Sequence, residues 1–304
     1  MKAGTYEGIL RKNMNKILVS LPTNSRQWLE TLELVSLPPG TVLFEPDEKV
    51  EHVYFLNNML VSIVSVNSEG STVEIGLIGH EGMVGVPAIL GGVTPYRAVV
   101  QMGGDAFRVR SQNLCDEFRR DPLLHDLLLK YTNAFIIQVA QSTICNCYHT
   151  LQERLCRWLL VARDAARSDI LMLTHDVIAR LLGTRRASVT VAAGLLQRAG
   201  LVRIARGQLT ILDPEGLRAM ACECYEILSD GIRRAQASYS LAQLRSSTWG
   251  SQIRSASSGC WPARRGPASS PARAEPTRAR SAFRGRSAPL RDGPTRQRPS
   301  AAAM

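Results

Sequence analysis

Residues 173–212 contain two short amphipathic helical patterns that are separated by a single glycine. In the first pattern, apolar residues recur at helical spacing after Thr174, whose hydroxyl is a good helix cap, and the pattern ends at Gly183. The second pattern follows Thr184, which we expect to cap it, and has one apolar side. That side consists of Val189, Ala192, Ala193 and Leu196. Two such helices with a glycine in the turn predict a helix-turn-helix.

A short β-hairpin is predicted directly after the second helix, because two apolar-rich runs flank Arg206 and Gly207. From 171 to 212 the chain has six arginines against one acid, Asp176, which suits the phosphate backbone of double-stranded DNA. An ordinary helix pair with solvated arginines would not explain the cap, turn, period and hairpin in this order. We therefore expect a winged helix-turn-helix whose second helix enters the major groove. The candidate DNA contacts are Thr174, Thr184, Arg185, Arg186, Ala187, Ser188, Thr190, Val191 and Arg206.

Residues 35–120 change from helical to strand periodicity. Short apolar runs are separated by turn residues, and six glycines between 76 and 92 indicate sharp backbone turns. This region predicts an antiparallel β sandwich or barrel. Before it, residues 1–34 are interpreted as an N-terminal arm with one short helix, capped by Asn24 or Ser25.

A long helix is expected at 121–148, where side chains suited to a coiled-coil seam alternate at spacings of four and three. They are Leu124, Leu128, Tyr131, Phe135 and Gln138. We interpret them as the interface of a homodimer, because a two-fold pair of reading helices contacts two half-sites one DNA turn apart. A buried helix that packs on its own domain is the alternative.

These parts, in this order, resemble the Crp/Fnr family of bacterial transcription regulators. The resemblance covers residues 35–228 and rests on motifs such as GHEG at 79–82 and ERL at 153–155. It implies an α+β fold with three parts. They are a jelly-roll-like, cyclic-nucleotide-binding-like β domain at 35–120, a dimerisation helix at 121–148 and a winged helix-turn-helix domain at 149–229. It also implies sequence-specific transcription regulation, in which the β domain senses an unidentified signal and controls the placement of the recognition helices. RNA polymerase is a further candidate partner.

The resemblance places Arg186, Ala187 and Val191 at the positions from which family members most often touch base edges. Only Arg186 keeps the usual chemistry, since an arginine can bond bidentately to guanine. Ala187 and Val191 offer only apolar contacts, such as contacts to a thymine methyl group. We therefore expect an operator that differs from the well-known consensus sites of the family.

The resemblance also locates an effector pocket at Gly85, Val86, Tyr96 and Arg97. Cyclic-nucleotide-binding members have a glutamate for the ribose and an Arg-Ser pair for the phosphate. Here Val86 takes the glutamate position, and the arginine comes one residue late, at Arg97, where it would point to the opposite side of its strand. We expect no response to cyclic AMP, so the effector is an unidentified small molecule or there is none. The first cysteine is Cys115, so the N-terminal cysteines that hold an iron–sulfur cluster in the oxygen-sensing branch are missing.

The seven cysteines include two close pairs, Cys145 with Cys147 and Cys222 with Cys224, and His149 lies near the first pair. Residues two apart on a helix point about 200° away from each other, so neither pair is expected to chelate one ion. We expect reduced thiols and neither metal nor cofactor, with a metal- or thiol-based redox sensor as an alternative. The chain has no phosphate loop, zinc-protease or nucleophile-elbow motif, so we do not expect an enzyme.

Residues 230–304 are rich in Ser, Arg, Ala, Pro and Gly and predict a disordered tail. From 231 on there are fourteen arginines, no lysine and two acids, so the tail accounts for the formal net charge of +11. A tail-driven, non-specific nucleic-acid binder is therefore an alternative function, and a shifted reading frame would also produce such a composition. Because we find no secretory signal and no apolar run of membrane-spanning length, we expect a cytoplasmic protein that does not contact a membrane.

Overall fold

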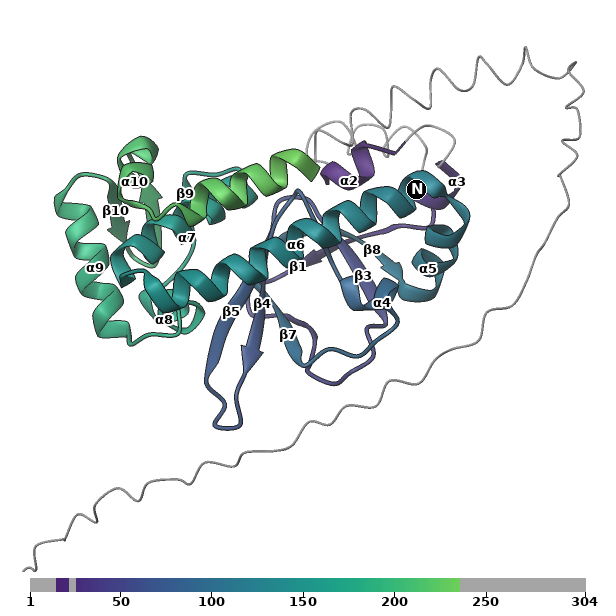
Figure 1. Ribbon diagram of the computed structural model, residues 1–304, viewed down its shortest axis with the longest axis horizontal. Coiled ribbons are helices and arrows are strands. Elements are labelled where there is room, and N and C mark those ends of the chain that lie inside the picture. The colour runs from purple at the N-terminus through teal and green to yellow at the C-terminus, as the bar shows by residue number, and fades with distance from the viewer. Residues whose placement is uncertain (1–14, 22–25, 236–304) are drawn as a thin grey trace, which may run out of the picture. The chain divides into compact units, whose positions relative to one another are not determined.

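The computed structural model describes residues 15–21 and 26–235. Its β domain is a sandwich of two four-stranded antiparallel sheets (Figure 1). The strands of the first sheet are, in order, β1 (Glu33–Leu37), β8 (Gly104–Arg110), β3 (His52–Leu56) and β6 (Met83–Val84). The strands of the second sheet are, in order, β2 (Val42–Phe44), β7 (Tyr96–Met102), β4 (Leu60–Val66) and β5 (Thr72–Ile78). This architecture confirms the predicted sandwich.

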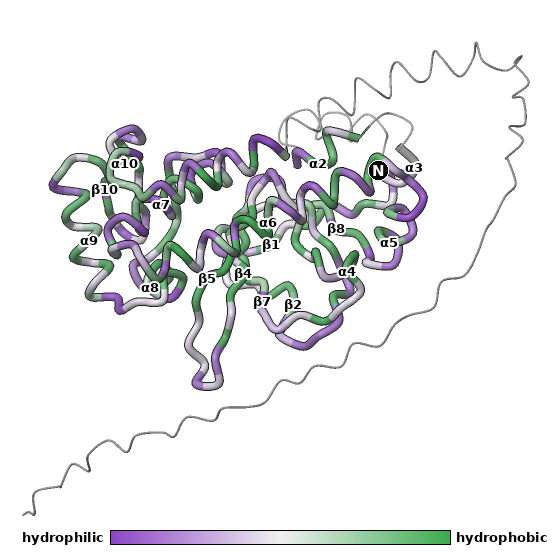
Figure 2. The backbone as a smooth tube through the Cα atoms, in the orientation of Figure 1, coloured by the Kyte–Doolittle hydropathy of each residue, from purple (hydrophilic) through white to green (hydrophobic). Residues whose placement is uncertain are grey.

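The sandwich encloses an apolar core, and the turn between β4 and β5 is hydrophilic (Figure 2). The short helix α4 (Val86–Leu90) follows β6 through Gly85, whose φ of +116° favours glycine. A Cβ at Gly85 would lie 2.9 Å from a methyl carbon of Val53, so this close approach also requires glycine. The glycine-rich segment therefore bends sharply against the first sheet.

The N-terminal segment differs from the predicted arm with a single helix. Its described residues contain the helices α2 (Lys16–Val19) and α3 (Arg26–Leu29), and the predicted caps Asn24 and Ser25 lie outside the described residues. Asn15 caps α2 with its side-chain oxygen, and its amide nitrogen donates to two backbone carbonyls of the β domain at 3.0 and 2.6 Å. Helix α2 cannot be predicted from the local sequence, because these contacts come from residues distant in the chain.

A helix α5 (Ser111–Arg120) leads into the long helix α6 (Pro122–Tyr148). The carboxylate of Asp121 accepts hydrogen bonds from the first two free N–H groups of α6, which fixes where the helix begins. The inner face of α6 shares a hydrophobic core with β3, β6 and α5. This helix therefore forms one wall of the β domain.

The five side chains predicted as the dimer interface face the β domain of their own chain. Leu124 and Leu128 have no exposed surface. Tyr131 donates to a carbonyl of β6 at 2.8 Å, and Gln138 donates to a carbonyl of β5 at 3.0 Å. Phe135 packs against a glycine of β5, where a Cβ would come within 2.6 Å of its ring. The assignment to a dimer interface is wrong, because a spacing of four and three defines a straight helix face but not the neighbour that covers it.

The DNA-binding part predicted from the sequence consists of four helices and a three-stranded sheet in the order β10-β11-β9. The helices are α7 (Leu151–Ala166), α8 (His175–Leu181), α9 (Arg186–Arg198) and α10 (Pro214–Met220). The strands are β9 (Ile170–Leu171), β10 (Val202–Ala205) and β11 (Gln208–Ile211). A capping box of Thr150 and Glu153 starts α7, and Trp158 lies at the centre of the core. The predicted fold class, a β domain followed by a long helix and a winged helix-turn-helix, is confirmed.

At the end of the described residues, a helix occupies residues 224–235 and lies beside α6 (Figure 1). Leu228, Ile232 and Ala235 continue one apolar face, and the first and last of these are buried. The predicted disordered tail at 230–304 was therefore placed too early, and its remainder lies outside the described residues. No helix in the described part of the chain is long and apolar enough to cross a membrane.

Candidate nucleic-acid interface

The start of helix α8 and the turn that follows it are determined by residues close in the sequence. The Thr174 hydroxyl accepts a backbone N–H of the first turn at 3.3 Å, and Gly183 adopts a φ of +61° after the helix. The predicted cap at Thr184 is wrong, since α9 begins one residue later with Arg185 at the N-cap and no side-chain capping bond. The N–H of Thr184 instead closes the turn by donating to the carbonyl of Ala179 at 2.9 Å.

Helix α9 is anchored on one side and open on the other. Val189, Ala193 and Leu196 have no exposed surface and belong to the core shared with α7 and α8. Most of the predicted DNA contacts lie on the open side. The exposed ones on α9 and its cap are Arg185, Arg186, Ala187, Thr190 and Val191, and Ser188 is half-buried. Anchoring and exposure therefore alternate along α9 as a reading helix requires.

The polar groups at the start of α9 are linked to α8. The Arg186 guanidinium lies 3.8 Å from the Asp176 carboxylate, and both side chains are more than half exposed. The Thr190 hydroxyl donates to the carbonyl of Arg186 at 3.0 Å and lies 3.0 Å from Nδ1 of His175. An exposed pair at this distance contributes little to stability, so the guanidinium is available to another anion.

The wing is the hairpin of β10 and β11. Its turn residues Arg206 and Gly207 have φ of 50° and 77°, which is the backbone that a tight two-residue hairpin turn requires. The Arg206 side chain is exposed at the tip. A Cβ at Gly207 would lie 3.7 Å from the Thr174 methyl group, so the wing turn lies next to the start of α8. The predicted DNA contacts Thr174 and Arg206 are thus neighbours.

A buried polar contact joins the β domain to the DNA-binding domain, and the sequence analysis missed it. The Trp158 indole of α7 donates to one carboxylate oxygen of Glu74 in β5 at 2.7 Å, and the Ser62 hydroxyl donates to the other at 2.5 Å. Burial raises the pKa of Glu74 to about 7, against the hydrogen bonds from Ser62 and Trp158 and the charge of Arg157. In the sequence, the one indication of this contact is that Glu74 is an acid at an inward-facing position of an apolar strand.

Two further contacts lie at the same boundary. Gly183, in the turn of the helix-turn-helix, is close to β5, since a Cβ there would lie 3.3 Å from a methyl of Val73. The carbonyl of Ala165, at the end of α7, lies 3.0 Å from Nδ1 of His80 and accepts its backbone N–H at 3.3 Å. The β4–β5 hairpin and the loop after it therefore fix the DNA-binding domain at both α7 and the reading turn.

The four residues predicted to line an effector pocket do not form a polar site. Val86 is buried in the core beneath α5 and α6, whereas Tyr96 packs against Phe44 between the sheets with ring centres 6.2 Å apart. Arg97 lies on the opposite side of β7 from Tyr96 and donates to the carboxylate of Glu45 at 2.6 Å. The charge that could hold a phosphate is therefore paired within the chain.

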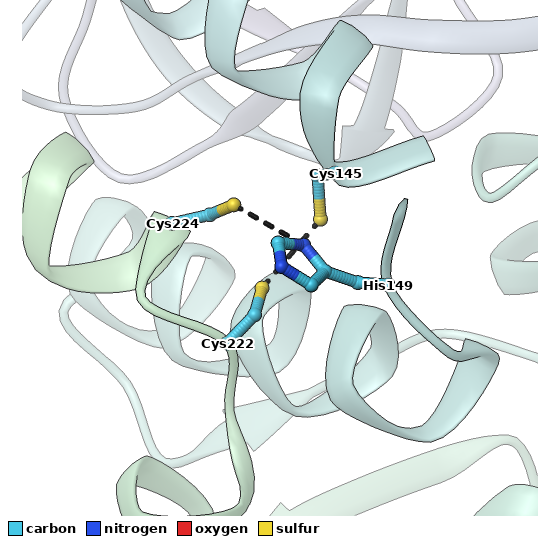
Figure 3. A group of neighbouring side chains, drawn as sticks. All are labelled: Cys145, His149, Cys222 and Cys224. Atoms are coloured by element: carbon cyan, nitrogen blue, oxygen red, sulfur yellow. Dashed lines mark hydrogen bonds between the residues drawn. The ribbon is translucent and has the colours of Figure 1, made fainter. Parts of the chain in front are cut away.

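A group of possible metal ligands lies between the end of α6 and the start of helix 224–235 (Figure 3). Its members are Cys145, His149, Cys222 and Cys224. Chelation by Cys222 and Cys224 was not expected, on the assumption that both lie in one helix. That assumption is wrong, because Cys222 precedes the helix that begins at Cys224.

The described parts combine a β-sandwich domain, a long helix and a winged helix-turn-helix, and this combination defines a class of DNA-binding proteins. Two family matches support this. The cyclic nucleotide-binding domain family matches residues 34–121, and the Crp-like helix-turn-helix domain family matches residues 153–220. The chain belongs to the Crp/Fnr family, and it is a sequence-specific DNA-binding transcription regulator rather than an enzyme.

Relatives of known name agree with this assignment. The chain is 24% identical over 197 residues to the global nitrogen regulator of Synechococcus elongatus, a match that covers 61% of this chain and 88% of the relative. It is 26% identical to the transcriptional regulator SdrP of Thermus thermophilus, covering 62% and 94%. Among solved structures, FixK2 of Bradyrhizobium japonicum has the same fold at 17% identity and a TM-score of 0.55, covering 63% and 98%. Proteins of this family are typically dimeric.

Proposed function

We propose that this regulator binds DNA as a homodimer in which Arg186 of each protomer reads a guanine edge in the major groove. The observation that carries the proposal is the open first turn of α9, where the Arg186 side chain is 70% exposed. Its ion pair with Asp176 is long and solvated, so it can be exchanged for a base contact. A guanidinium in this position can form the bidentate bond that distinguishes guanine from the other bases.

The other residues of this surface differ in their chemistry. Ala187 and Val191 can make only apolar contacts, and Val191 is 65% exposed, so a thymine methyl group suits both positions. Hydroxyls and cations position the protein on phosphates without reading sequence. The residues proposed for that role are Thr174, Thr184, Arg185, Ser188, Thr190 and Arg206.

The test compares Arg186→Ala with Arg198→Ala, because both are exposed cations of α9 and only Arg186 lies in its first turn. We expect Arg186→Ala to weaken binding to a selected operator by about 1–3 kcal/mol and to relax the preference at one base pair per half-site. Arg198→Ala should weaken binding slightly and equally on all sequences. Fluorescence anisotropy on operator and scrambled duplexes measures both. An equal loss on every duplex from Arg186→Ala would make it a phosphate contact and refute the proposal.

The proposed dimer uses the outer face of α6 in place of the residues first predicted. That face carries a second stripe at spacings of four and three, and every member is exposed. The stripe consists of Leu129, Asn133, Ile136, Ala140, Thr143 and Cys147. Leu129 is 43% exposed and Ile136 58% exposed, which leaves apolar surface available for a partner helix. Because proteins of this family are typically dimeric, we propose this exposed stripe as the dimer interface.

Control by the β domain is proposed to pass through the contact of Glu74 with Trp158. This contact is the buried polar link between β5 and α7, so a change in the hairpin must either move α7 or break the link. Cyclic AMP is not the proposed signal, because Val86 offers no acceptor and Arg97 is paired with Glu45. The effector, an RNA polymerase contact and a cytoplasmic location stay predictions from the sequence.

A further inference from the structure

Four side chains with metal-binding atoms converge between the end of α6 and the start of helix 224–235 (Figure 3). The ligand atoms of Cys145, His149, Cys222 and Cys224 all lie within 4.8 Å of one another. The Sγ atoms of Cys145 and Cys222 are 3.6 Å apart, and Sγ of Cys224 is 3.4 Å from Nδ1 of His149. The three cysteines are buried and the histidine is half-buried.

The backbone explains why these residues meet although they are 77 residues apart in the chain. Cys145 lies in the last turn of α6 and His149 ends that helix, so a four-residue spacing places both on one side. Cys222 precedes the terminal helix and Cys224 begins it, which lets both thiols point to the same place. Cys147 lies two residues from Cys145 within α6 and is exposed outside the group.

We propose that Cys145, His149, Cys222 and Cys224 bind one Zn²⁺ ion in a closed tetrahedral site. Three thiolates and one imidazole are a ligand set that structural zinc sites use. With Zn–S bonds of about 2.3 Å, the sulfur atoms of a tetrahedral site lie about 3.8 Å apart. The observed separations of 3.6 and 3.4 Å therefore fit the ion with only small side-chain shifts.

The surroundings of the group also match those of a metal site. Nε2 of His149, the second ring nitrogen, lies 3.2 Å from a carboxylate oxygen of Glu223. A carboxylate on the second nitrogen fixes the imidazole tautomer that a metal requires. The side-chain amide of Gln141 donates to Sγ of Cys224 at 3.1 Å, as a group that supports a thiolate does.

Charge balance is an independent argument. A zinc ion with three thiolates carries one net negative charge, which is costly to bury without a cation. Arg157 of α7 is 7% exposed, and its Nε has no hydrogen-bond partner in the described structure, so α7 holds a buried cation that can offset such a charge.

Two other uses of these thiols fit less well. A disulfide between Cys145 and Cys222 would need the sulfurs to approach to about 2.0 Å, and it would leave Cys224 and His149 without a role. An iron–sulfur cluster has a core of several atoms between its protein ligands. Ligand atoms that all lie within 4.8 Å leave room for one ion.

A zinc ion at this place would join the start of helix 224–235 to the end of α6. The ligands come from both segments, so the ion would crosslink the end of the DNA-binding domain to the helix that carries the proposed dimer stripe. This inference goes beyond the proposed function, since it would stand if the chain bound DNA in another way.

The experiment measures metal in the full chain, produced with zinc in the medium and purified under reducing conditions without chelators. Mass spectrometry of metal content should give about one zinc ion per chain for the wild type and for Cys115→Ser, a control at a free cysteine outside both the group and the dimer stripe. Cys222→Ser and Cys224→Ser should lose most of the zinc. Metal content close to zero in the wild type, or an equal loss in Cys115→Ser, would overturn the proposal.

Cobalt makes the test independent of how the variants fold. The zinc-free wild-type chain is titrated with Co²⁺, which should give the intense visible bands of tetrahedral cobalt and a thiolate charge-transfer band, saturating at about one equivalent. Only the weak bands of octahedral cobalt, or a Cys145–Cys222 disulfide found by mass spectrometry in the reduced preparation, would refute the site.

Discussion

Replacing Glu74 by glutamine tests the buried link between the two domains. The carboxylate accepts from Trp158 on one oxygen and from Ser62 on the other. A glutamine can accept from the indole with its oxygen and donate to the serine hydroxyl with its nitrogen, so both hydrogen bonds can persist. The substitution therefore removes a titratable charge while it keeps the shape and polarity of the contact.

The expected change in the free energy of unfolding follows from the pKa of Glu74, which burial raises from 4.5 to about 7. A raised carboxyl pKa means that the folded chain holds the proton more tightly than the unfolded chain. The stability that this proton provides is full below pH 4.5 and is lost as the pH rises towards 7. Each pH unit between the two values is worth about 1.4 kcal/mol, so ionised Glu74 costs about 3 kcal/mol above pH 7.

The assay is thermal and urea unfolding of wild type and Glu74→Gln from pH 5 to pH 8. We expect the advantage of the variant to grow from less than about 1 kcal/mol at pH 5 to about 3 kcal/mol at pH 8. Glu69→Gln, at an exposed position in the same hairpin, is the control and should change nothing. An advantage that does not vary with pH would refute the reasoning, since it would show that Glu74 does not titrate between the two states in this range.

Two further predictions concern the dimer and the effector. Ile136→Glu should dissociate the dimer in sedimentation velocity, while Leu90→Glu, at an equally exposed aliphatic position outside the stripe, should not. Dissociation by both variants, or by neither, would contradict the seam. Cyclic AMP should change neither the melting temperature nor the DNA affinity, because a ligand shifts an equilibrium only through differential binding. Micromolar binding in calorimetry that is lost in Arg97→Ala would show that Arg97 leaves Glu45 for a phosphate.

Helix caps and turns could be predicted from the sequence at several positions. The cap at Thr174, the left-handed Gly183 and the wing turn at Arg206 each depend on residues within a few positions of one another. The inner face of α6 could not be assigned, because Leu128 and Ile136 belong to stripes with the same spacing. Which stripe is covered depends on the β domain, and that information is not local.

The groups that the sequence analysis missed are all made by distant residues. The contact of Glu74 with Trp158 spans 84 residues, and that of Cys145 with Cys222 spans 77. The two thiols of Cys222 and Cys224 would point in opposite directions only if both residues lay in one helix. The break before Cys224 removes that objection, and no local pattern marks the break, which is visible only in the structure.

The charge of Arg157 acts on both the buried Glu74 and the cysteine group. Arg157 precedes Trp158 on α7, and its charge lowers the pKa of both Glu74 and Cys145, in each case against the larger effect of burial. A buried guanidinium is costly unless anions offset it. Above pH 7 Glu74 supplies such a charge from the β domain, and zinc-bound thiolates would supply another from the end of α6. The two anionic groups would thus share one cation, so that removing either makes the position of α7 depend more strongly on the other.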